Sequence, residues 1–227
     1  MKTVILTGAN RGLGKAIHDL LISEEYKDYN KIFTSRTKDF NGSKFNNNSD
    51  YIKIDLSDET IDCSHIRIKT HTEQIVLINN AGVIEPIGQM IKLPIAPVKR
   101  SMNVNFLSPL QIIKYLTLEA KKINSSLLII NISSGAANRP IQGWVSYCSS
   151  KAAIKMAIDV TAAENENIEV IHFDPGVMDT DMQKAIRSKN ESEMKEVDVF
   201  KKFKDNDLLQ NPTNVAKDIL ALFDRSD

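Results

Sequence analysis

The sequence has little cysteine and no net charge. Cys63 and Cys148 are its only cysteines, and their separation fits neither a disulfide framework nor a paired-cysteine zinc motif. Lysines and arginines number 29, and aspartates and glutamates also number 29. No overall field therefore draws nucleic acid or anionic lipid to the chain. The histidines do not cluster at ligand spacing, so we expect no metal site.

Long hydrophobic runs are also lacking. The chain passes from Lys2 into Val4, Ile5 and Leu6, a run too short for a signal peptide or a membrane span. We therefore expect a soluble, cytoplasmic protein that contacts no membrane. The 227 residues suit one α/β domain that spans residues 1–227.

Short apolar runs rich in β-branched residues alternate with stretches of helical spacing. Six runs predict strands: Val4 to Leu6, Ile32 to Thr34, Tyr51 to Ile54, Ile75 to Ile78, Leu127 to Ile132 and Ile168 to Phe173. Two of the helical stretches carry Leu13, Ile17, Leu20 and Leu21, and Ala153, Met156, Ala157 and Val160. This alternation predicts an α/β fold of the Rossmann type: a doubly wound, mainly parallel sheet of about six strands with helices on both faces.

Two stretches are too polar for this pattern. Residues Thr37 to Asp50 predict a solvated loop in place of a crossover helix. From Gln183 to Asp207 the chain is dense with charge, which predicts a mobile surface segment rather than a core element. We expect residues 183–211 to act as a lid over a substrate. Pro212 and Thr213 then open a last helix.

A glycine-rich turn follows the first predicted strand directly and leads into a helix. Its glycines are Gly8, Gly12 and Gly14. A strand, a glycine turn and a helix amino terminus bring backbone N–H groups to a pyrophosphate. The spacing differs from both G-x-G-x-x-G and the loop of nucleotide triphosphatases. From this run alone, a glycine-rich connector that binds no ligand remains an alternative explanation.

Tyr147 and Lys151 lie four residues apart at the start of a predicted helix, so both side chains share one face. A nearby ammonium lowers the pKa of a phenol toward the working range of an acid and base. Ser134 follows the fifth predicted strand, where it can hold a substrate oxygen. Taken singly, the tyrosine and lysine pair is equally well explained as an amphipathic interfacial pair.

Together, these motifs resemble the short-chain dehydrogenase/reductase family of the single-domain type, in order and over nearly the whole chain. The resemblance implies four catalytic residues: Asn105, Ser134, Tyr147 and Lys151. Tyr147 would protonate a carbonyl oxygen that Ser134 holds, Lys151 would lower the pKa of the phenol and bind the nicotinamide ribose, and Asn105 would position a relay water. The implied cofactor-binding residues are Gly8, Asn10, Arg11, Gly12, Leu13, Gly14, Arg36, Asp55, Leu56, Asn80, Ala81, Gly82, Tyr147, Lys151, Pro175, Gly176, Val177 and Thr180. Asn79 and Asn80 have a second explanation as turn formers.

The second predicted strand ends in Ser35 and Arg36, without the carboxylate that normally binds the ribose 2′-hydroxyl of NAD. Arg36 can instead meet a 2′-phosphate, and Arg11 supplies a second cation. We therefore predict NADPH/NADP+ as the cofactor, with NADH less favoured. The alternative is that both arginines are ordinary surface charges.

By family position, the predicted substrate pocket contains Ile84, Trp144, Met178 and Thr180, with core packing an equal explanation for Trp144. Residues 174–182 resemble those of sepiapterin reductases and of bacterial benzil or carbonyl reductases. We therefore predict an NADPH-dependent oxidoreductase that acts as a carbonyl reductase. Its predicted substrate is a small ketone, a diketone or a pterin-type carbonyl.

Two other functions stay open. The same fold can serve as a non-catalytic NADP(H)-binding sensor. An epimerase or dehydratase of nucleotide sugars is the other alternative, although the chain is short for it. We also expect a homodimer in which the helices near Phe106 to Tyr115 and Lys151 to Val160 pair across a two-fold axis.

Overall fold

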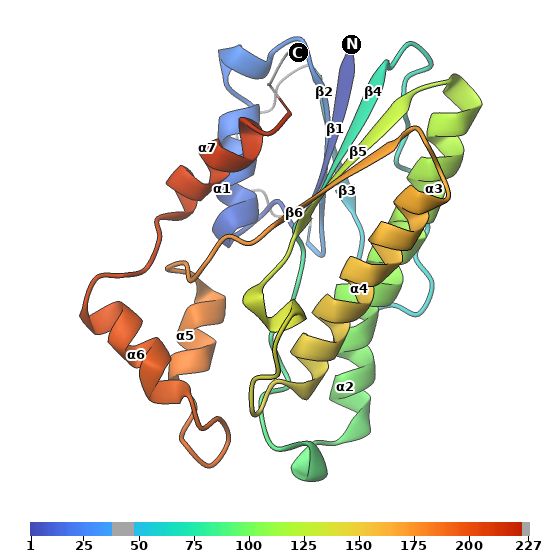
Figure 1. The fold of residues 1–227 in the computed structure, drawn as a ribbon. Coiled ribbons are helices and arrows are strands. Elements are labelled where there is room, and N and C mark those ends of the chain that lie inside the picture. Colours follow the sequence, from blue (N-terminus) through green and yellow to red (C-terminus); the bar gives the residue numbers. More distant parts are fainter. Residues whose placement is uncertain (38–47, 224–227) are drawn as a thin grey trace.

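A computed structural model describes residues 1–37 and 48–223. At its centre lies a parallel sheet with the strand order β3-β2-β1-β4-β5-β6 (Figure 1). The strands are β1 (Lys2–Thr7), β2 (Asn30–Ser35), β3 (Ser49–Lys53), β4 (Gln74–Asn79), β5 (Ser126–Ile132) and β6 (Ile168–Phe173). All six predicted strands are confirmed. The order reverses between β1 and β4, and the carboxyl ends of these two strands open the crevice in which such sheets bind ligands.

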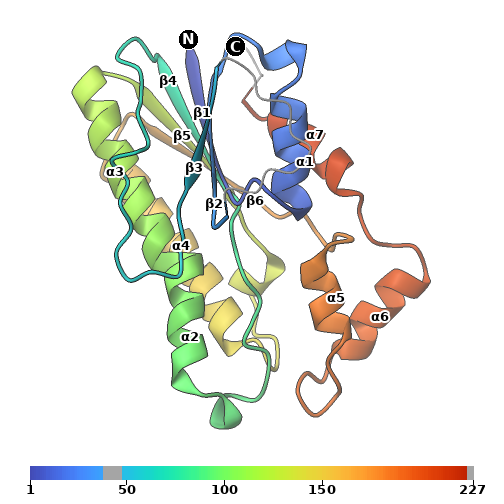
Figure 2. The ribbon, with the colours of Figure 1, turned by 180° about the vertical axis from the view of Figure 1, so that it is seen from behind.

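Helices cover both faces of the sheet (Figures 1 and 2). On one face lie α1 (Gly12–Leu21) and α7 (Pro212–Leu220); on the other lie α2 (Ile95–Met102), α3 (Ser108–Ile123) and α4 (Val145–Ala163). Each face has its own apolar core, with Ile17 and Ile219 fully buried in the first and Leu116 and Ile158 in the second. The predicted doubly wound fold is therefore confirmed, including a last helix that begins at Pro212.

The structure places the apolar face of α4 differently from the predicted spacing. Ile154 and Ile158 are fully buried against the sheet, whereas Met156 is 63% exposed and Val160 48% exposed. Alanines complete the pattern that includes Met156 and Val160, so that pattern identifies a helix but not the side that faces the core. Two large apolar side chains of α4 are thus left on the surface.

Short helical turns mark several connections between these elements. They are η1 (Glu24–Tyr26), η2 (Met90–Lys92) and η4 (Gly135–Ala137), together with one π-helical turn, η3 (Asn103–Leu107), between α2 and α3. Of the loop predicted over Thr37 to Asp50, residues 38–47 lie outside the described residues. Ser49 and Asp50 already belong to β3, so the predicted loop extends too far.

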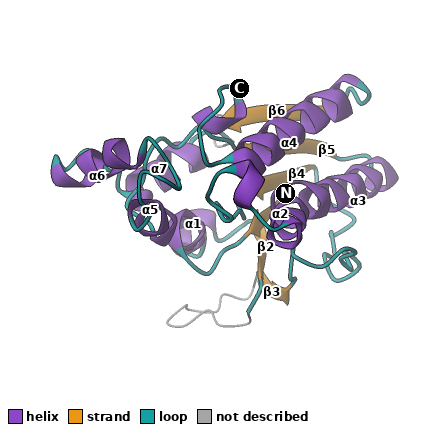
Figure 3. Ribbon diagram, turned by 90° about the horizontal axis from the view of Figure 1, so that it is seen from below, coloured by secondary structure: helices purple, strands orange, loops and turns teal. Residues whose placement is uncertain are grey.

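Residues 183–211 do contain core elements, which corrects the expectation of a surface segment. They include most of α5 (Asp181–Arg187) and all of α6 (Val197–Asp205), which Figure 3 shows beside the sheet's covering helices. The side chains of Ile186, Met194, Val197 and Phe200 are buried in a third apolar cluster. Burial of these few apolar side chains stabilises the segment, although most of its other residues are charged or polar.

Candidate active site

The glycine turn is held by the end of β4. The Thr7 hydroxyl accepts hydrogen bonds from the backbone N–H groups of Asn80 and Ala81, each at 3.0 Å. The Asn80 amide donates to the carbonyl of Thr7 at 2.9 Å. Gly8 has φ +69°, and a Cβ there would lie 3.1 Å from Cα of Ala81. The turn therefore needs glycine both for its backbone conformation and for its close approach to β4.

The amino terminus of α1 is free to meet an anion. Its first turn contains no acidic side chain, and the capping residue, Arg11, makes no side-chain hydrogen bond to it. Gly12, at φ +53°, lies close to Thr180, since a Cβ there would lie 3.6 Å from the Thr180 methyl. Backbone N–H donors and the helix dipole are what a pyrophosphate requires. The predicted cofactor residues thus fit a dinucleotide here.

Charged side chains lie beyond the carboxyl ends of β2 and β3. Asp55 accepts hydrogen bonds from the backbone N–H of Ser57 at 2.9 Å and from its hydroxyl at 2.8 Å. Burial alone would raise the pKa of Asp55. The two bonds from Ser57 and the cations of Arg36 and Arg100 together outweigh burial and hold this pKa below its usual range. Arg11 and Arg36 are both exposed. Two exposed cations, one at the glycine turn and one after β2, can reach a ligand phosphate.

The side chains of Tyr147 and Lys151 are both buried, at 7% and 6% exposure. The Lys151 amine lies 5.8 Å from the centre of the phenol ring and donates to the carbonyl of Ile132 at 2.7 Å. Burial lowers the pKa of Lys151 to about 8, although the Asp174 carboxylate opposes this shift. The amine therefore exchanges its proton close to neutral pH.

The expected lowering of the Tyr147 pKa is not found. Burial raises the pKa of this phenol to about 12, a hydrogen bond with Ser134 acts in the opposite direction, and Asp174 and Cys148 raise it further. Desolvation disfavours the phenolate more than the nearby polar groups favour it. Tyr147 is thus a protonated phenol at neutral pH and can act as a proton donor.

Asn105 joins three parts of the site from within the π-helical turn. Its carbonyl accepts from the backbone N–H of Val83 at 2.9 Å, and its amide donates to the carbonyl of Val83 at 2.8 Å. The amide also donates to the Ser150 hydroxyl at 3.1 Å, and that hydroxyl donates to the carbonyl of Tyr147. Asn105 therefore fixes the segment after β4 to the start of α4. Single π-helical turns often occur at functional sites because they turn one residue toward them.

The remaining predicted residues border these groups. Ser134 follows β5, and its hydroxyl accepts from the backbone N–H of Ala136 at 3.2 Å. Ile84 and Trp144 lie with Tyr147 in the third apolar cluster. Met178 packs instead against the first cluster, beside α1 and α7. Of the predicted pocket residues, Ile84 and Trp144 thus lie with Tyr147, whereas Met178 packs elsewhere.

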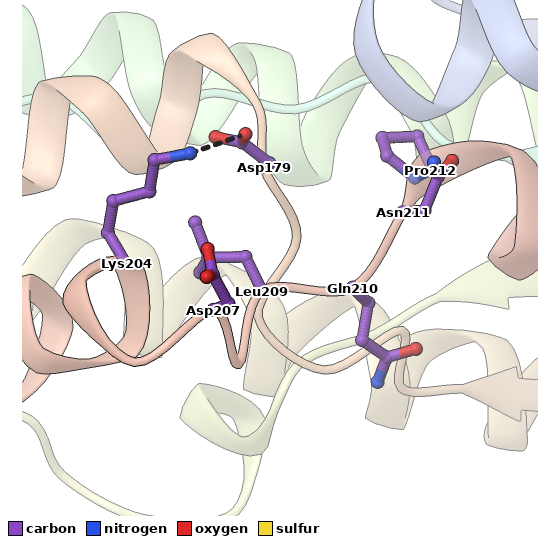
Figure 4. A pocket seen from close by; sticks show the side chains of 7 residues that line it. All are labelled: Asp179, Lys204, Asp207, Leu209, Gln210, Asn211 and Pro212. Carbon is purple, nitrogen blue, oxygen red and sulfur yellow. Dashed lines mark hydrogen bonds and ion pairs between the residues drawn. The ribbon is translucent and has the colours of Figure 1, made fainter.

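The loop after β6 is held by the chain's last connection. The backbone N–H of Asp179 donates to the carbonyl of Gln210 at 3.2 Å, and the N–H of Gln210 donates to the carbonyl of Val177 at 2.9 Å. A Cβ on Gly176, at φ +66°, would lie 2.6 Å from the Gln210 amide nitrogen. Figure 4 shows the adjoining pocket, where the Lys204 amine meets the Asp179 carboxylate at 3.0 Å. This pocket lies behind the predicted cofactor loop and includes none of the predicted catalytic residues.

Three further residues reach the site without having been predicted to take part in it. Asp174 directly follows β6 and acts electrostatically on both Tyr147 and Lys151. Met194 and Phe200 pack against Trp144. Their signal in the sequence is the spacing of Met194, Val197 and Phe200, three residues apart within a charged stretch.

Within residues 1–37 and 48–223, no group of three or more histidine, cysteine, aspartate or glutamate side chains is placed to hold a metal ion. In the same part of the chain, no helix has both the length and the apolar character needed to cross a membrane.

A strand order that reverses at a glycine turn, together with a serine, a tyrosine and a lysine at the carboxyl edge of the sheet, defines a class of dinucleotide-binding oxidoreductases. Residues 2–191 match the family model described as short chain dehydrogenase. The chain belongs to the short-chain dehydrogenase/reductase family, whose members bind nicotinamide cofactors.

Curated relatives and solved structures agree with this membership. The benzil reductase ((S)-benzoin forming) of Bacillus subtilis is 31% identical over 232 residues, which cover 99% of this chain and 94% of the relative. The sepiapterin reductase of Xenopus laevis is 29% identical over 80% of this chain and 75% of its own. The crystal structure of the KRED1-Pglu enzyme matches with a TM-score of 0.81 and 26% identity, over 100% of this chain and 96% of that one.

Proposed function

We propose that the protein is an NADPH-dependent carbonyl reductase with Tyr147 as its general acid. The observation that carries this proposal is the buried phenol of Tyr147 beside the buried amine of Lys151, which lies 5.8 Å from the centre of the ring. Ser134 shares a hydrogen bond with this phenol and stands where it can hold the same oxygen. A binding module without turnover would have no need of a buried acid beside a buried amine.

Each residue of the site has a task in this reaction. The bound dinucleotide supplies the hydride. Ser134 holds the carbonyl oxygen, and Tyr147 donates its proton to that oxygen as negative charge develops there. Lys151, with a pKa of about 8, returns a proton to the phenolate and binds ribose hydroxyls. Asn105 keeps the start of α4 in place and positions the relay water.

Preference for NADPH is assigned to Arg36 and Arg11. Both are exposed beside the proposed adenine end of the groove, and β2 ends without a carboxylate at that point. A guanidinium binds a phosphate through two parallel hydrogen bonds. It is also more weakly hydrated than an ammonium, so less hydration is lost on binding. The charge of a 2′-phosphate, which NADH lacks, would be recognised in this way.

The proposed substrate is a small ketone or diketone, with a pterin-type carbonyl as the close alternative. Ile84 and Trp144 supply apolar and aromatic walls next to Tyr147, as such a substrate requires. The relatives named benzil reductase and sepiapterin reductase support both members of this substrate class. Residues 183–211 are proposed to act as the lid, because α6 contributes Phe200 to the same wall.

We further propose a homodimer that works in the cytoplasm. Four large apolar side chains are exposed on neighbouring helical elements: Leu107 of η3, Leu118 of α3, and Met156 and Val160 of α4. Exposed apolar side chains gathered on adjacent helices are typical of an interface between protein chains.

The test of function is the oxidation of NADPH at 340 nm by the purified protein. The panel consists of aromatic diketones, simple ketones, quinones and sepiapterin, with NADH measured in parallel. Turnover of a ketone or of sepiapterin with NADPH supports the proposal. Absence of turnover across the panel, with NADPH still bound, would favour a sensor.

A further inference from the structure

Trp144 has a polar atom that is buried next to the catalytic phenol. Its side chain is 4% exposed, and its ring meets that of Tyr147 edge to face, with centroids 5.6 Å apart. The indole N–H donates to the sulfur of Met194 at 3.2 Å. A thioether sulfur is a weak acceptor compared with a carbonyl oxygen. The N–H thus has a partner that a ligand oxygen can replace with a gain in free energy.

Met194 lies in a segment between α5 and α6 that packs against Gly143. Gly143, at φ +87°, lets this segment approach closely, since a Cβ there would lie 2.5 Å from the carbonyl oxygen of Glu193. The Gln89 amide donates to the carbonyl of Ser192 at 3.3 Å, and Arg139 meets Glu196 at 3.6 Å. These two polar contacts lie near solvent and contribute little stability.

Met194 itself is fully buried by this packing. It packs with Trp144, Phe200 and Tyr147 in one apolar cluster. We expect a substrate that packs against Trp144 beside the phenol to take the place of Met194, and this displacement leaves the indole N–H without its sulfur partner. An unpaired buried donor lowers the affinity for any ligand that cannot accept its hydrogen bond.

We propose that Trp144 selects dicarbonyl substrates: once Met194 withdraws, the indole N–H donates to the second oxygen of a substrate whose first oxygen lies against Tyr147 and Ser134. The inference rests on the proposed carbonyl reduction and names the substrate class within it. A monoketone of the same shape also displaces the sulfur from the indole N–H but offers no second oxygen to accept its hydrogen bond. The monoketone therefore binds less tightly in the transition state, and this difference discriminates between the two ketones.

The kinetic test compares benzil with deoxybenzoin, which has the same two rings and a methylene in place of one carbonyl. In wild-type protein with NADPH, kcat/KM is expected to favour benzil. The Trp144→Phe variant keeps an aromatic wall and removes the donor, so the preference for benzil should fall about tenfold, as for one lost hydrogen bond. Equal losses for both ketones would overturn the proposal, because Trp144 would then act through packing alone.

Met194→Leu provides the matched variant, since it conserves volume and removes only the sulfur acceptor. Neither ketone then has to break the bond between the indole and the sulfur. Both kcat/KM values should rise by a similar factor, and their ratio should stay as in the wild type. A ratio that collapses in Met194→Leu would contradict the proposal, because the donor to the second oxygen is still present.

A binding measurement separates this inference from the proposed function. Trp144 is the single tryptophan of the chain, so its fluorescence reports on this site alone. In Tyr147→Phe with NADP+ present, a titration should change the Trp144 emission and give tighter binding for benzil than for deoxybenzoin. If wild type reduces neither ketone but this preference is found, the proposed function fails and the role of Trp144 stands. Equal affinities would overturn the role of Trp144 whether or not turnover occurs.

Discussion

The amine of Lys151 donates to the backbone carbonyl of Ile132, at 2.7 Å, and is thereby tied to the end of β5. The next residues along the chain lead to Ser134, so this bond sets the position of the amine relative to the serine. α4 carries both Lys151 and Tyr147, so this bond links the helix that bears the phenol to the strand that leads to Ser134.

The first prediction concerns pH. Burial lowers the pKa of Lys151 to about 8, so the ammonium that returns a proton to Tyr147 is present below this pH and is lost above it. We expect kcat/KM for ketone reduction to be level near pH 7 and to fall about tenfold for each unit of pH well above 8.

Rates between pH 6 and pH 10 check this prediction, with NADPH binding measured at each pH. Lys151→Arg keeps a cation whose pKa lies far higher. We expect this variant to be slower than the wild type, and its kcat/KM should not fall at high pH. A wild-type profile that stays level to pH 10 would contradict the role of Lys151 as proton donor.

Cofactor preference is predicted to depend on Arg36. Replacement by leucine removes the bidentate donor, and the dissociation constant of NADPH should rise about tenfold to a hundredfold, as for a hydrogen bond to a charged group. The dissociation constant of NADH should change little, because NADH has no 2′-phosphate. Lys122→Ala is the control, since Lys122 lies at the end of α3 with its side chain 71% exposed. Equal weakening for both cofactors would refute the assignment of Arg36.

The dimer is predicted to depend on the exposed apolar side of α4. Replacing Met156 and Val160 together by glutamate places like charges at the proposed two-fold contact, and the molecular mass in light scattering should fall to that of a monomer. Leu208→Glu is the control, because Leu208 is 60% exposed after α6 and belongs to neither α3 nor α4. A monomeric wild type, or a dimer that survives the double change, would rule out this interface.

A buried lysine in β2 gives a prediction about stability. Lys31 is 1% exposed, and its amine has no hydrogen-bond partner among the described residues. Burial lowers the pKa of this amine. Because the unfolded chain then binds the proton more tightly, stability rises with pH as pH approaches the usual lysine pKa of 10.5.

Lys31→Met should therefore raise the free energy of unfolding at neutral pH, by about 1–3 kcal/mol, since it removes an unpaired buried amine. It should also reduce the gain in stability at higher pH. Urea unfolding at pH 7 and pH 10 measures both effects, with Lys27→Met as the exposed control. A destabilised Lys31→Met variant would show that the amine has a stabilising partner.

Much of the fold follows from local sequence. The β-branched runs predict the central strands because these are buried on both faces, as the fully buried Ile5 of β1 and Ile78 of β4 illustrate. The edge strands β3 and β6 are less buried, and their β-branched and aromatic residues predict them all the same. The glycine turn and the spacing of Tyr147 and Lys151 are equally local, since a turn and one helical face are set by neighbours in the chain.

The rest depends on contacts between distant residues. Nothing in the spacing of α4 tells which side meets the sheet, so the exposure of Met156 could not be predicted. The burial of Met194 depends on Gly143, far earlier in the chain, whose missing Cβ admits the backbone of Glu193. The pKa of Tyr147 likewise is raised chiefly by burial in the folded chain, whereas its spacing from Lys151 alone predicts the opposite direction.

The most direct test of the account is the Tyr147→Phe variant in carbonyl reduction. The change removes the phenolic hydroxyl alone, and loss of a general acid is expected to lower kcat by about a hundredfold to ten-thousandfold. Binding of NADPH should persist, which shows that the fold and the groove are intact. A Tyr147→Phe protein that reduces ketones at the wild-type rate would contradict the assignment of Tyr147 as the acid.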